Sequence, residues 1–358
     1  MKTKNSINIA KLFGINVQIH WSFLFLLLFF FFSSLYQNSG MEEAIARVLF
    51  IISIFGCVIL HEFGHALTAR KFGCKTKRII IFPLGGIAEM AKLPEKPSQE
   101  FLVAIAGPMV NFVIAALLYL HLESFQYLDF EENNLIKNNF TENLLNINII
   151  LGVFNLIPAF PMDGGRILRS LLAIKFNRAK ATKIAANLGQ FIAIIFIILG
   201  FSYNIFLIFI GIFIFIAAHN EDLYEESRSA ISNYKIKNLM MTNYSKLNEN
   251  DHLDKVINIV LSSQEKEFVI SNNDNQPVGI LTQNDIIKSL SLKKNYHLYD
   301  IMNKNFLKFT ENDNLKISYD KMLETQNNIV AITRNARLIA ILNLENIQEF
   351  LLFNKISK

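Results

Sequence analysis

The sequence predicts a polytopic α-helical membrane protein with a small β-strand segment, followed by a soluble α/β tail. The 358-residue chain is 52% hydrophobic and contains 32 Phe, and its mean hydropathy is +0.30, which is too apolar for an ordinary soluble protein of this length. Long apolar runs occur only before about residue 220, and the remainder is rich in Asn, Lys and Asp. Two cysteines, Cys57 and Cys74, are too few for a disulfide framework.

Six apolar runs are long enough, or nearly so, to cross about 30 Å of hydrocarbon. They cover residues 17–36, 44–72, 101–122, 144–160, 182–201 and 203–219. The first run follows several lysines, as in a signal peptide, but it is too long and lacks a small-x-small cleavage site. We therefore expect about six transmembrane helices.

The charges between these runs alternate in sign, which predicts the orientation of the chain. Basic residues precede the first run and follow the second and fourth: Lys2, Lys4, Lys11, Arg70, Lys71, Lys75, Lys77, Arg78, Arg166, Arg169, Lys175, Arg178, Lys180 and Lys183. Acidic residues follow the first and third runs: Glu42, Glu43, Glu123, Asp129, Glu131 and Glu132. Under the positive-inside rule, both termini and the tail are expected to face the cytoplasm. We expect a multi-pass protein of the cell (inner) membrane.

The second run contains the motif "HEFGH". Ionisable groups within a membrane span cost roughly 2.5–3.5 kcal/mol each on insertion scales, which indicates a function for them. His61 and His65 are four residues apart, so both imidazoles lie on one helical face and can reach one metal ion, and Glu62 can contact a water on that ion. Imidazole and carboxylate ligands suit Zn²⁺, with Glu62 as the general base of a hydrolase.

Two ligands are too few for a zinc site, so a third must come from another segment. We predict Asp163 in "FPMDGGR", where Pro161 is expected to end the fourth helix on the cytoplasmic side. An ordinary turn carboxylate is the alternative for Asp163, and an interhelical hydrogen bond is the alternative to an oxyanion-stabilising role for Asn155. Other candidate third ligands are His20, His219 and His121, the last expected at the outer face.

These segments resemble those of the site-2 proteases, intramembrane zinc metalloproteases. "HEFGH" is similar to the metal helix of that family, and "NLIPAFPMDGGR" to its second motif, with Asn155 and Asp163 at matching positions and Met162 where Leu is usual. "LFGINVQIHWSF", "FPLGGIAEM" and "AGPMVNF" resemble further family segments. The resemblance implies one Zn²⁺ per chain and hydrolysis of peptide bonds in or near transmembrane helices of membrane-anchored substrates.

Two parts of the chain near these segments also support predictions that do not depend on the resemblance. Residues 78–82 are β-branched and apolar, which predicts a strand that either holds an unwound substrate by main-chain hydrogen bonds or forms a structural hairpin. In "AGPMVNF", Gly107 and Pro108 are expected to interrupt the third helix. Asn111 is expected to make an interhelical hydrogen bond rather than to act in catalysis.

The tail contains two similar halves of about 55 residues from Ile236 onward. Each half reads as a βαββα unit, and the tandem resembles a pair of cystathionine-β-synthase (CBS) domains. Gly279, Thr282 and Asp285 match the nucleotide-contacting segment of that family, which implies an ATP or AMP site. The equivalent positions of the second half are Ala340, Asn343 and Asn346. The alternative to a nucleotide site is a tail that forms dimers without binding a ligand. The lysines of the tail indicate a solvated face rather than a nucleic-acid site.

The predicted organisation is a membrane metalloprotease domain over residues 1–220, a linker over 221–235, and CBS domains over 236–290 and 291–358. We expect a zinc metalloendopeptidase of regulated intramembrane proteolysis that its tail modulates. One alternative is a catalytically silent membrane scaffold, against which Glu62 argues. The other is a CBS-tailed transporter, against which the clustering of polar groups at one end argues.

Overall fold

The computed structural model describes residues 6–37, 40–83, 85–90, 94–126, 135–263, 265–291 and 296–356. The loop charges Lys2, Lys4, Asp129, Glu131 and Glu132, and Leu84 of "FPLGGIAEM", lie outside this part of the chain. The chain divides into two compact units, Met1–Glu225 and Glu226–Lys358.

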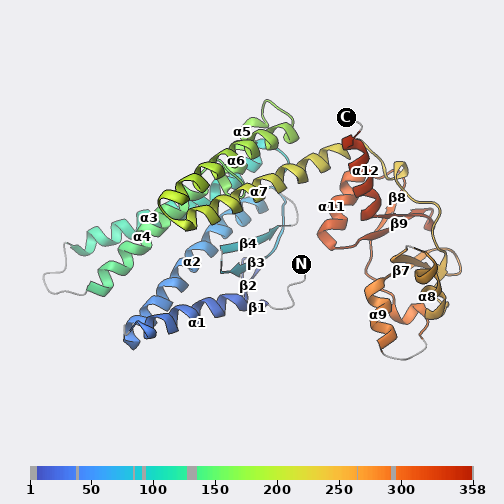
Figure 1. Cartoon of the computed structure of the whole chain (residues 1–358), viewed down its shortest axis with the longest axis horizontal. Helices are drawn as coiled ribbons and strands as arrows, with labels where there is room; N and C mark the ends of the chain where they lie inside the picture. Colours follow the sequence, from blue (N-terminus) through green and yellow to red (C-terminus); the bar gives the residue numbers. More distant parts are fainter. Residues whose placement is uncertain are drawn as a thin grey trace. The chain divides into compact units, whose positions relative to one another are not determined.

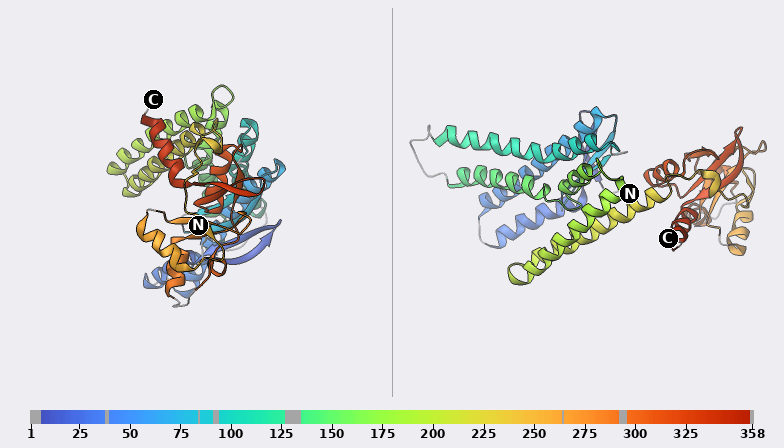
Figure 2. Two further views of the ribbon diagram at one scale, coloured as in Figure 1. Left: turned by 90° about the vertical axis from the view of Figure 1, so that its right-hand side faces the viewer. Right: turned by 90° about the horizontal axis from the view of Figure 1, so that it is seen from above.

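The first unit is a helical bundle, and each apolar run of the sequence overlaps one of its helices (Figure 1). These helices are α1 (Trp21–Tyr36), α2 (Met41–Lys71), α3 (Pro97–Gln126), α4 (Leu135–Asn155), α6 (Arg178–Ser202) and α7 (Ile205–Ala230). A short helix, α5 (Asp163–Leu172), follows α4. Helix α3 packs against α2, α4 and α5, and Figure 2 shows α3 and α4 side by side.

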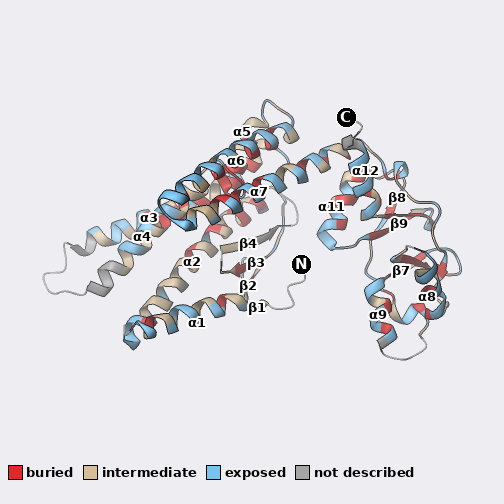
Figure 3. Cartoon of the chain, viewed as in Figure 1, coloured by how far each residue is buried: buried red, intermediate tan, exposed pale blue. Residues whose placement is uncertain are grey.

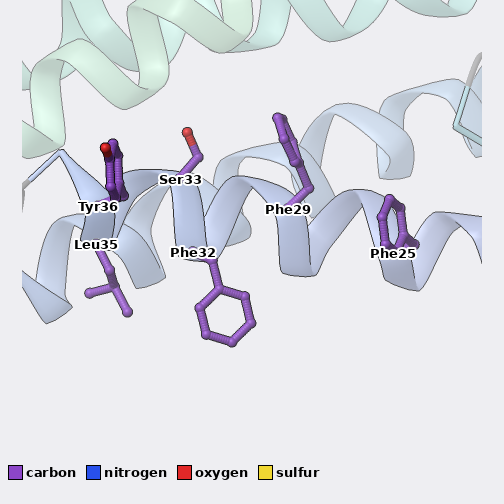
Figure 4. A pocket seen from close by; sticks show the side chains of 6 residues that line it. All are labelled: Phe25, Phe29, Phe32, Ser33, Leu35 and Tyr36. Atoms are coloured by element: carbon purple, nitrogen blue, oxygen red, sulfur yellow. The ribbon is translucent and has the colours of Figure 1, made fainter.

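Four helices in the described part of the chain are long and apolar enough to cross a membrane, namely α2, α3, α6 and α7. Helix α1 is apolar but has only 16 residues. Phe29 and Ser33 project to one side of α1 and Phe32 and Leu35 to the other, and Phe29 and Phe32 are both exposed (Figure 4). Exposed apolar side chains on two sides of a helix are typical of lipid contact. Crossing by α1 and α4 stays a prediction.

A four-stranded sheet packs beside α2. Its strands are β1 (Ser6–Leu12), β2 (Ile15–His20), β3 (Thr76–Phe82) and β4 (Gly85–Met90), in the order β1-β2-β3-β4. Strands β2 and β3 are parallel, and the other pairs are antiparallel. Val17, Ile79 and Ile81 pack on Phe63 and Ala66 of α2 in one buried cluster. The sheet is thereby held against the helix that carries the "HEFGH" motif.

Three expected element boundaries were wrong. Residues 17–20 of the first run belong to β2 because the alternating β-branched sequence "INVQIH" pairs with two neighbouring strands, so the helix begins at Trp21. Helix α3 is not interrupted but continues through Pro108, as membrane helices tolerate proline. Helix α4 ends at Asn155, well before Pro161. Figure 3 shows buried residues where the helices of the first unit meet and within the strands of the second unit.

The second unit contains two βαββα halves, as expected. The first has β5 (Leu247–Asn248), α8 (Leu253–Ser262), β6 (Glu267–Ser271), β7 (Pro277–Thr282) and α9 (Gln283–Ser291), after a 3₁₀ turn at Ile236–Asn238. The second has α10 (Leu298–Ile301), β8 (Lys308–Thr310), α11 (Leu315–Thr325), β9 (Ile329–Arg334), β10 (Arg337–Asn343) and α12 (Leu344–Ile356). Each half forms a three-stranded sheet with one parallel and one antiparallel strand pair.

Candidate metal centre

His61, His65 and Asp163 converge at one point of the helical bundle. Nε2 of His61 and Nε2 of His65 are 3.0 Å apart, and each lies 3.1 Å from Oδ2 of Asp163. All three side chains are buried. Among the described residues they form a group of His and Asp side chains able to share one ion. Three atoms with these separations can each lie about 2.1 Å from a common point, which is the usual Zn–N and Zn–O distance.

The hydrogen-bond partners of the two imidazoles favour a cation at that point. Nδ1 of His65 lies 2.7 Å from the carbonyl oxygen of Val103, and Nδ1 of His61 lies 2.6 Å from Oδ1 of Asn111. Both partners are acceptors, so both Nδ1 atoms carry the ring proton of a neutral imidazole. Two Nε2 lone pairs then face the carboxylate of Asp163. Such a set of acceptors is stable when a metal ion lies among them, and the residues present therefore fit zinc.

Gly107 of α3 provides the space in front of the imidazoles. A Cβ atom at this position would lie 2.2 Å from Nε2 of His65 and 2.6 Å from Nε2 of His61. Any larger residue would therefore occupy the point where the donors converge. The glycine in "AGPMVNF" was expected to interrupt a helix, but its structural effect is this close approach of α3 to α2.

Glu62 lies on α2 beside the first residues of β4. A Cβ atom on Gly86 would be 3.0 Å from Cγ of Glu62 and 3.2 Å from Cγ1 of Val58. Strand β4 is at one end of the strand order, so its outer edge has no partner strand among the described residues. The candidate base and an edge strand are thus adjacent.

The chain reaches Asp163 through a tight turn after α4. Two glycines follow Asp163, and a Cβ on Gly164 would lie 2.2 Å from the carbonyl oxygen of Ile157, while one on Gly165 would lie 2.7 Å from the backbone of Phe160. These glycines let the start of α5 pack directly on the preceding backbone. Asp163 is the first residue of α5, so the position of that helix determines where its carboxylate lies.

A buried ion-pair network holds α5 in place, and the sequence did not indicate it. Arg169 of α5 donates to Glu100 of α3 and to Glu221 of α7. Arg178 of α6 donates to Glu100 and to Glu225 of α7. Arg169 and Glu100 are only 1% and 2% exposed. Both arginines were counted as loop charges in the sequence, where the carboxylate partners are too distant to be recognised.

The other residues that the sequence suggested for this site lie outside the group formed by His61, His65 and Asp163. Asn155 ends α4, and its Nδ2 donates to the carbonyl oxygen of Leu151 at 3.0 Å. His20 packs its ring against Phe82 and bonds Ser22. His121 lies near the end of α3 opposite to Val103, and His219 lies on α7. The group that could share one ion includes none of these residues.

In the tail, the two polar candidates of the first half bond to each other. The hydroxyl of Thr282 donates to Oδ2 of Asp285 at 2.6 Å, the backbone N–H of Thr282 donates to the same oxygen, and the N–H of Asp285 donates to the Thr282 hydroxyl. This reciprocal pattern at the start of α9 is a capping box. Gly279 lies against Met302, because a Cβ there would be 2.5 Å from its sulfur. In the second half, Asn343 accepts from the N–H of Asn346.

A helix bearing two imidazoles and a glutamate, with a carboxylate beside them, is the arrangement typical of zinc metalloproteases, and the long apolar helices are typical of a membrane protein. The sequence profile of Peptidase family M50 matches residues 49–145 and 129–199, and that of the CBS domain matches residues 236–292.

Curated relatives with the name zinc metalloprotease agree with the M50 profile. Zinc metalloprotease MJ0392 of Methanocaldococcus jannaschii is 40% identical over 239 residues, which cover 66% of this chain and 67% of that protein. Putative zinc metalloprotease sll0528 of Synechocystis is 30% identical over 303 residues, 79% of this chain and 77% of that protein. The solved site-2 protease of M. jannaschii is 37% identical, covers 61% of this chain and 95% of that chain, and has a TM-score of 0.44. The chain belongs to peptidase family M50.

Proposed function

We propose that this protein hydrolyses peptide bonds within, or at the edge of, transmembrane helices of membrane-anchored substrates. The observation that carries the proposal is the convergence of His61, His65 and Asp163 inside a bundle of apolar helices. A soluble protease has no need to bury its metal ligands behind surfaces suited to lipid, whereas an enzyme acting on membrane-embedded segments does.

The roles of the residues follow from their chemistry. His61, His65 and Asp163 would hold one Zn²⁺ per chain, and a bound zinc ion supplies Lewis acidity that polarises a carbonyl group and lowers the pKa of water. Glu62 takes a proton from the attacking water and passes it to the leaving amine. Asn155 supports the oxyanion when its amide exchanges the Leu151 carbonyl for the substrate carbonyl.

Strand β4 is suited to hold the substrate. A helical substrate has its carbonyl groups engaged in i to i−4 hydrogen bonds and must unwind before water reaches them. The outer edge of β4 offers main-chain groups to such an unwound segment, which would then lie beside Glu62. An extended segment is a better substrate than a helix because its bonds are accessible.

The location of the protein belongs to the same proposal. The alternating loop charges support a multi-pass protein of the cell (inner) membrane with both termini and the CBS tail in the cytoplasm. With that orientation the metal centre opens toward the cytoplasm, where a released cytoplasmic regulator would be the product. Reporter fusions at the C-terminus and between α3 and α4 test this orientation.

Modulation by the tail is supported by the course of α7. This helix runs from the apolar segment to Ala230, and the second unit begins at Glu226. Glu221 of α7 bonds Arg169, on the same short helix as Asp163. A displacement of α7 would therefore act on α5 and, through it, on a metal ligand. We propose residues 1–220 as the catalytic domain, 221–235 as the linker, and 236–290 and 291–358 as the CBS domains.

The ligand of the tail would be ATP or AMP, bound near Gly279, Thr282 and Asp285, and two tails would pair in a homodimer. The half-buried capping box supports this placement, because the carboxylate of Asp285 can accept from ribose hydroxyls, while the start of α9 and the hydroxyl of Thr282 suit a phosphate. A tail without ligand, which only pairs chains, is the other outcome of the nucleotide experiment described below.

The substitution Glu62→Gln tests the enzymatic function. Without the base, we expect turnover of a tagged single-span substrate to fall by roughly 10²- to 10⁴-fold, while zinc per chain is unchanged. Membrane proteins of cells with the native enzyme and with the Glu62→Gln variant are then compared by mass spectrometry, and substrates accumulate uncut in the variant. Normal turnover by Glu62→Gln would contradict the mechanism and favour a scaffold.

A further inference from the structure

A series of buried polar groups leads from helix α4 to the imidazole of His61. Nδ2 of Asn148 donates to the carbonyl oxygen of Leu144 at 2.8 Å, and Nδ2 of Asn111 donates to Oδ1 of Asn148 at 3.0 Å. Oδ1 of Asn111 then lies 2.6 Å from Nδ1 of His61. Both asparagines are completely buried. Three hydrogen bonds therefore connect a backbone carbonyl with a candidate metal ligand.

The backbone carbonyl determines the direction of every bond in this series. A carbonyl oxygen only accepts, so the amide nitrogen of Asn148, not its oxygen, must face Leu144. The oxygen of Asn148 then faces α3, where it accepts from the nitrogen of Asn111. The oxygen of Asn111 is left for His61, and it requires a proton on Nδ1 of that ring.

This proton position decides whether His61 can bind a metal ion. A neutral imidazole carries one proton, so a proton on Nδ1 leaves the lone pair on Nε2, the atom that faces His65 and Asp163. The tautomer of His65 is fixed directly by a backbone acceptor, because Nδ1 of His65 donates to the carbonyl oxygen of Val103. For His61 the backbone acceptor is two side chains away.

We propose that Asn148 is a positioning residue that, through Asn111, holds the His61 ring in the tautomer and orientation required for zinc binding. The proposal rests on the proposed metal site, because it assigns a role to α4 within it. Polar side chains in an apolar helix are costly, and an interhelical bond alone would be satisfied by either orientation of the two amides. The anchoring by Leu144 is what makes the orientation unique.

The test compares Asn148→Leu with Asn146→Leu in the full-length protein purified in detergent. Asn146 lies on the same helix, two residues away, but is exposed, so it provides the same chemical change outside the series. Zinc affinity is measured by competition with a chelator. We expect Asn148→Leu to bind zinc roughly 10- to 100-fold more weakly, as for other outer partners of metal ligands, and Asn146→Leu to bind normally. The visible spectrum of the Co²⁺ form should change only for Asn148→Leu.

A double variant separates positioning from general stability. Because Asn148 acts through Asn111, Asn111→Leu combined with Asn148→Leu should weaken zinc binding no more than Asn111→Leu alone. Additive losses, or an unchanged affinity in Asn148→Leu, would overturn the proposal. Asn148→Ala gives the same comparison if the leucine variant does not fold. Failure of the native protein to bind zinc would instead overturn the proposed metal site.

Discussion

Gly107 on α3 lies in contact with His65 on α2, so closely that a Cβ at residue 107 would be 2.2 Å from Nε2 of the imidazole. Close approach of two helices through glycine is common in membrane proteins. Here the approach also leaves room at the point shared by the three candidate metal ligands. The absence of a side chain at residue 107 is therefore as important to the candidate site as the ligands themselves.

The substitution Gly107→Ala should abolish zinc binding while the protein still folds. Alanine is a better helix former than glycine by about 1 kcal/mol, and the groups it would displace are the ends of side chains. Zinc per chain and the melting temperature are measured in parallel. Gly56→Ala on α2 is the control, because a Cβ there meets nothing within 4 Å. Full zinc binding by Gly107→Ala would contradict the observed packing.

Residue 86 offers a graded test of the contact between β4 and Glu62. Cβ of Gly86→Ala would press on Glu62 and Val58, and the extra methyl groups of Gly86→Val would displace Glu62 further. Turnover should fall from native to Ala to Val, with zinc still stoichiometric because no ligand is touched. Equal activity of all three proteins would show that the strand does not position the base.

The variant Asp163→Ala removes the proposed carboxylate ligand. Zinc affinity should fall by more than the roughly 10- to 100-fold expected for an outer partner, and activity should fall with it. Chelator competition measures the affinity. Unchanged zinc binding would reassign the third ligand, and His20 and His219 would then be the next residues to test.

The tail requires an experiment that separates ligand binding from helix capping. Asp285→Ala should lower the melting temperature of the ligand-free protein, because loss of a cap costs about 1 kcal/mol, and it should also eliminate the upward shift that ATP or AMP causes. Asn343→Ala is the matched control, since Asn343 accepts from the N–H of Asn346 near the start of α12. It should lower the melting temperature but keep the ligand shift. No shift in the native protein at millimolar nucleotide would favour a tail without ligand.

Several features could be predicted because they depend on neighbours along the chain. Each of the six apolar runs overlaps a helix, since hydropathy over a window of about 20 residues is a local property. The spacing of His61 and His65 places both on one face of α2 for the same reason. The nearness of Asp163 was predicted by reasoning about topology, which required only that two segments end at one depth of the membrane.

Boundaries were less predictable where pairing partners compete with hydropathy. The sequence "INVQIH" is apolar enough to extend a helix, but pairing with β1 and β3 makes it a strand. The matching segment "GILTQND" suggested a nucleotide site, while the structure adds a capping box between Thr282 and Asp285 that any helix start could use. Tertiary pairing therefore decided the structure of the first segment, whereas the capping box of the second is a local contact, and the nucleotide site stays a prediction.

By itself, the sequence determined that the first unit is built from apolar helices and which side chains are candidates for a metal site, because hydropathy, helix periodicity and side-chain chemistry are properties of short segments. Only the tertiary structure decided that Gly107 makes room for the donors, that Asn148 is connected with His61, and that Arg169 is held by carboxylates of two other helices. These contacts join residues many turns apart, so they depend on how helices pack and not on any pattern along the chain.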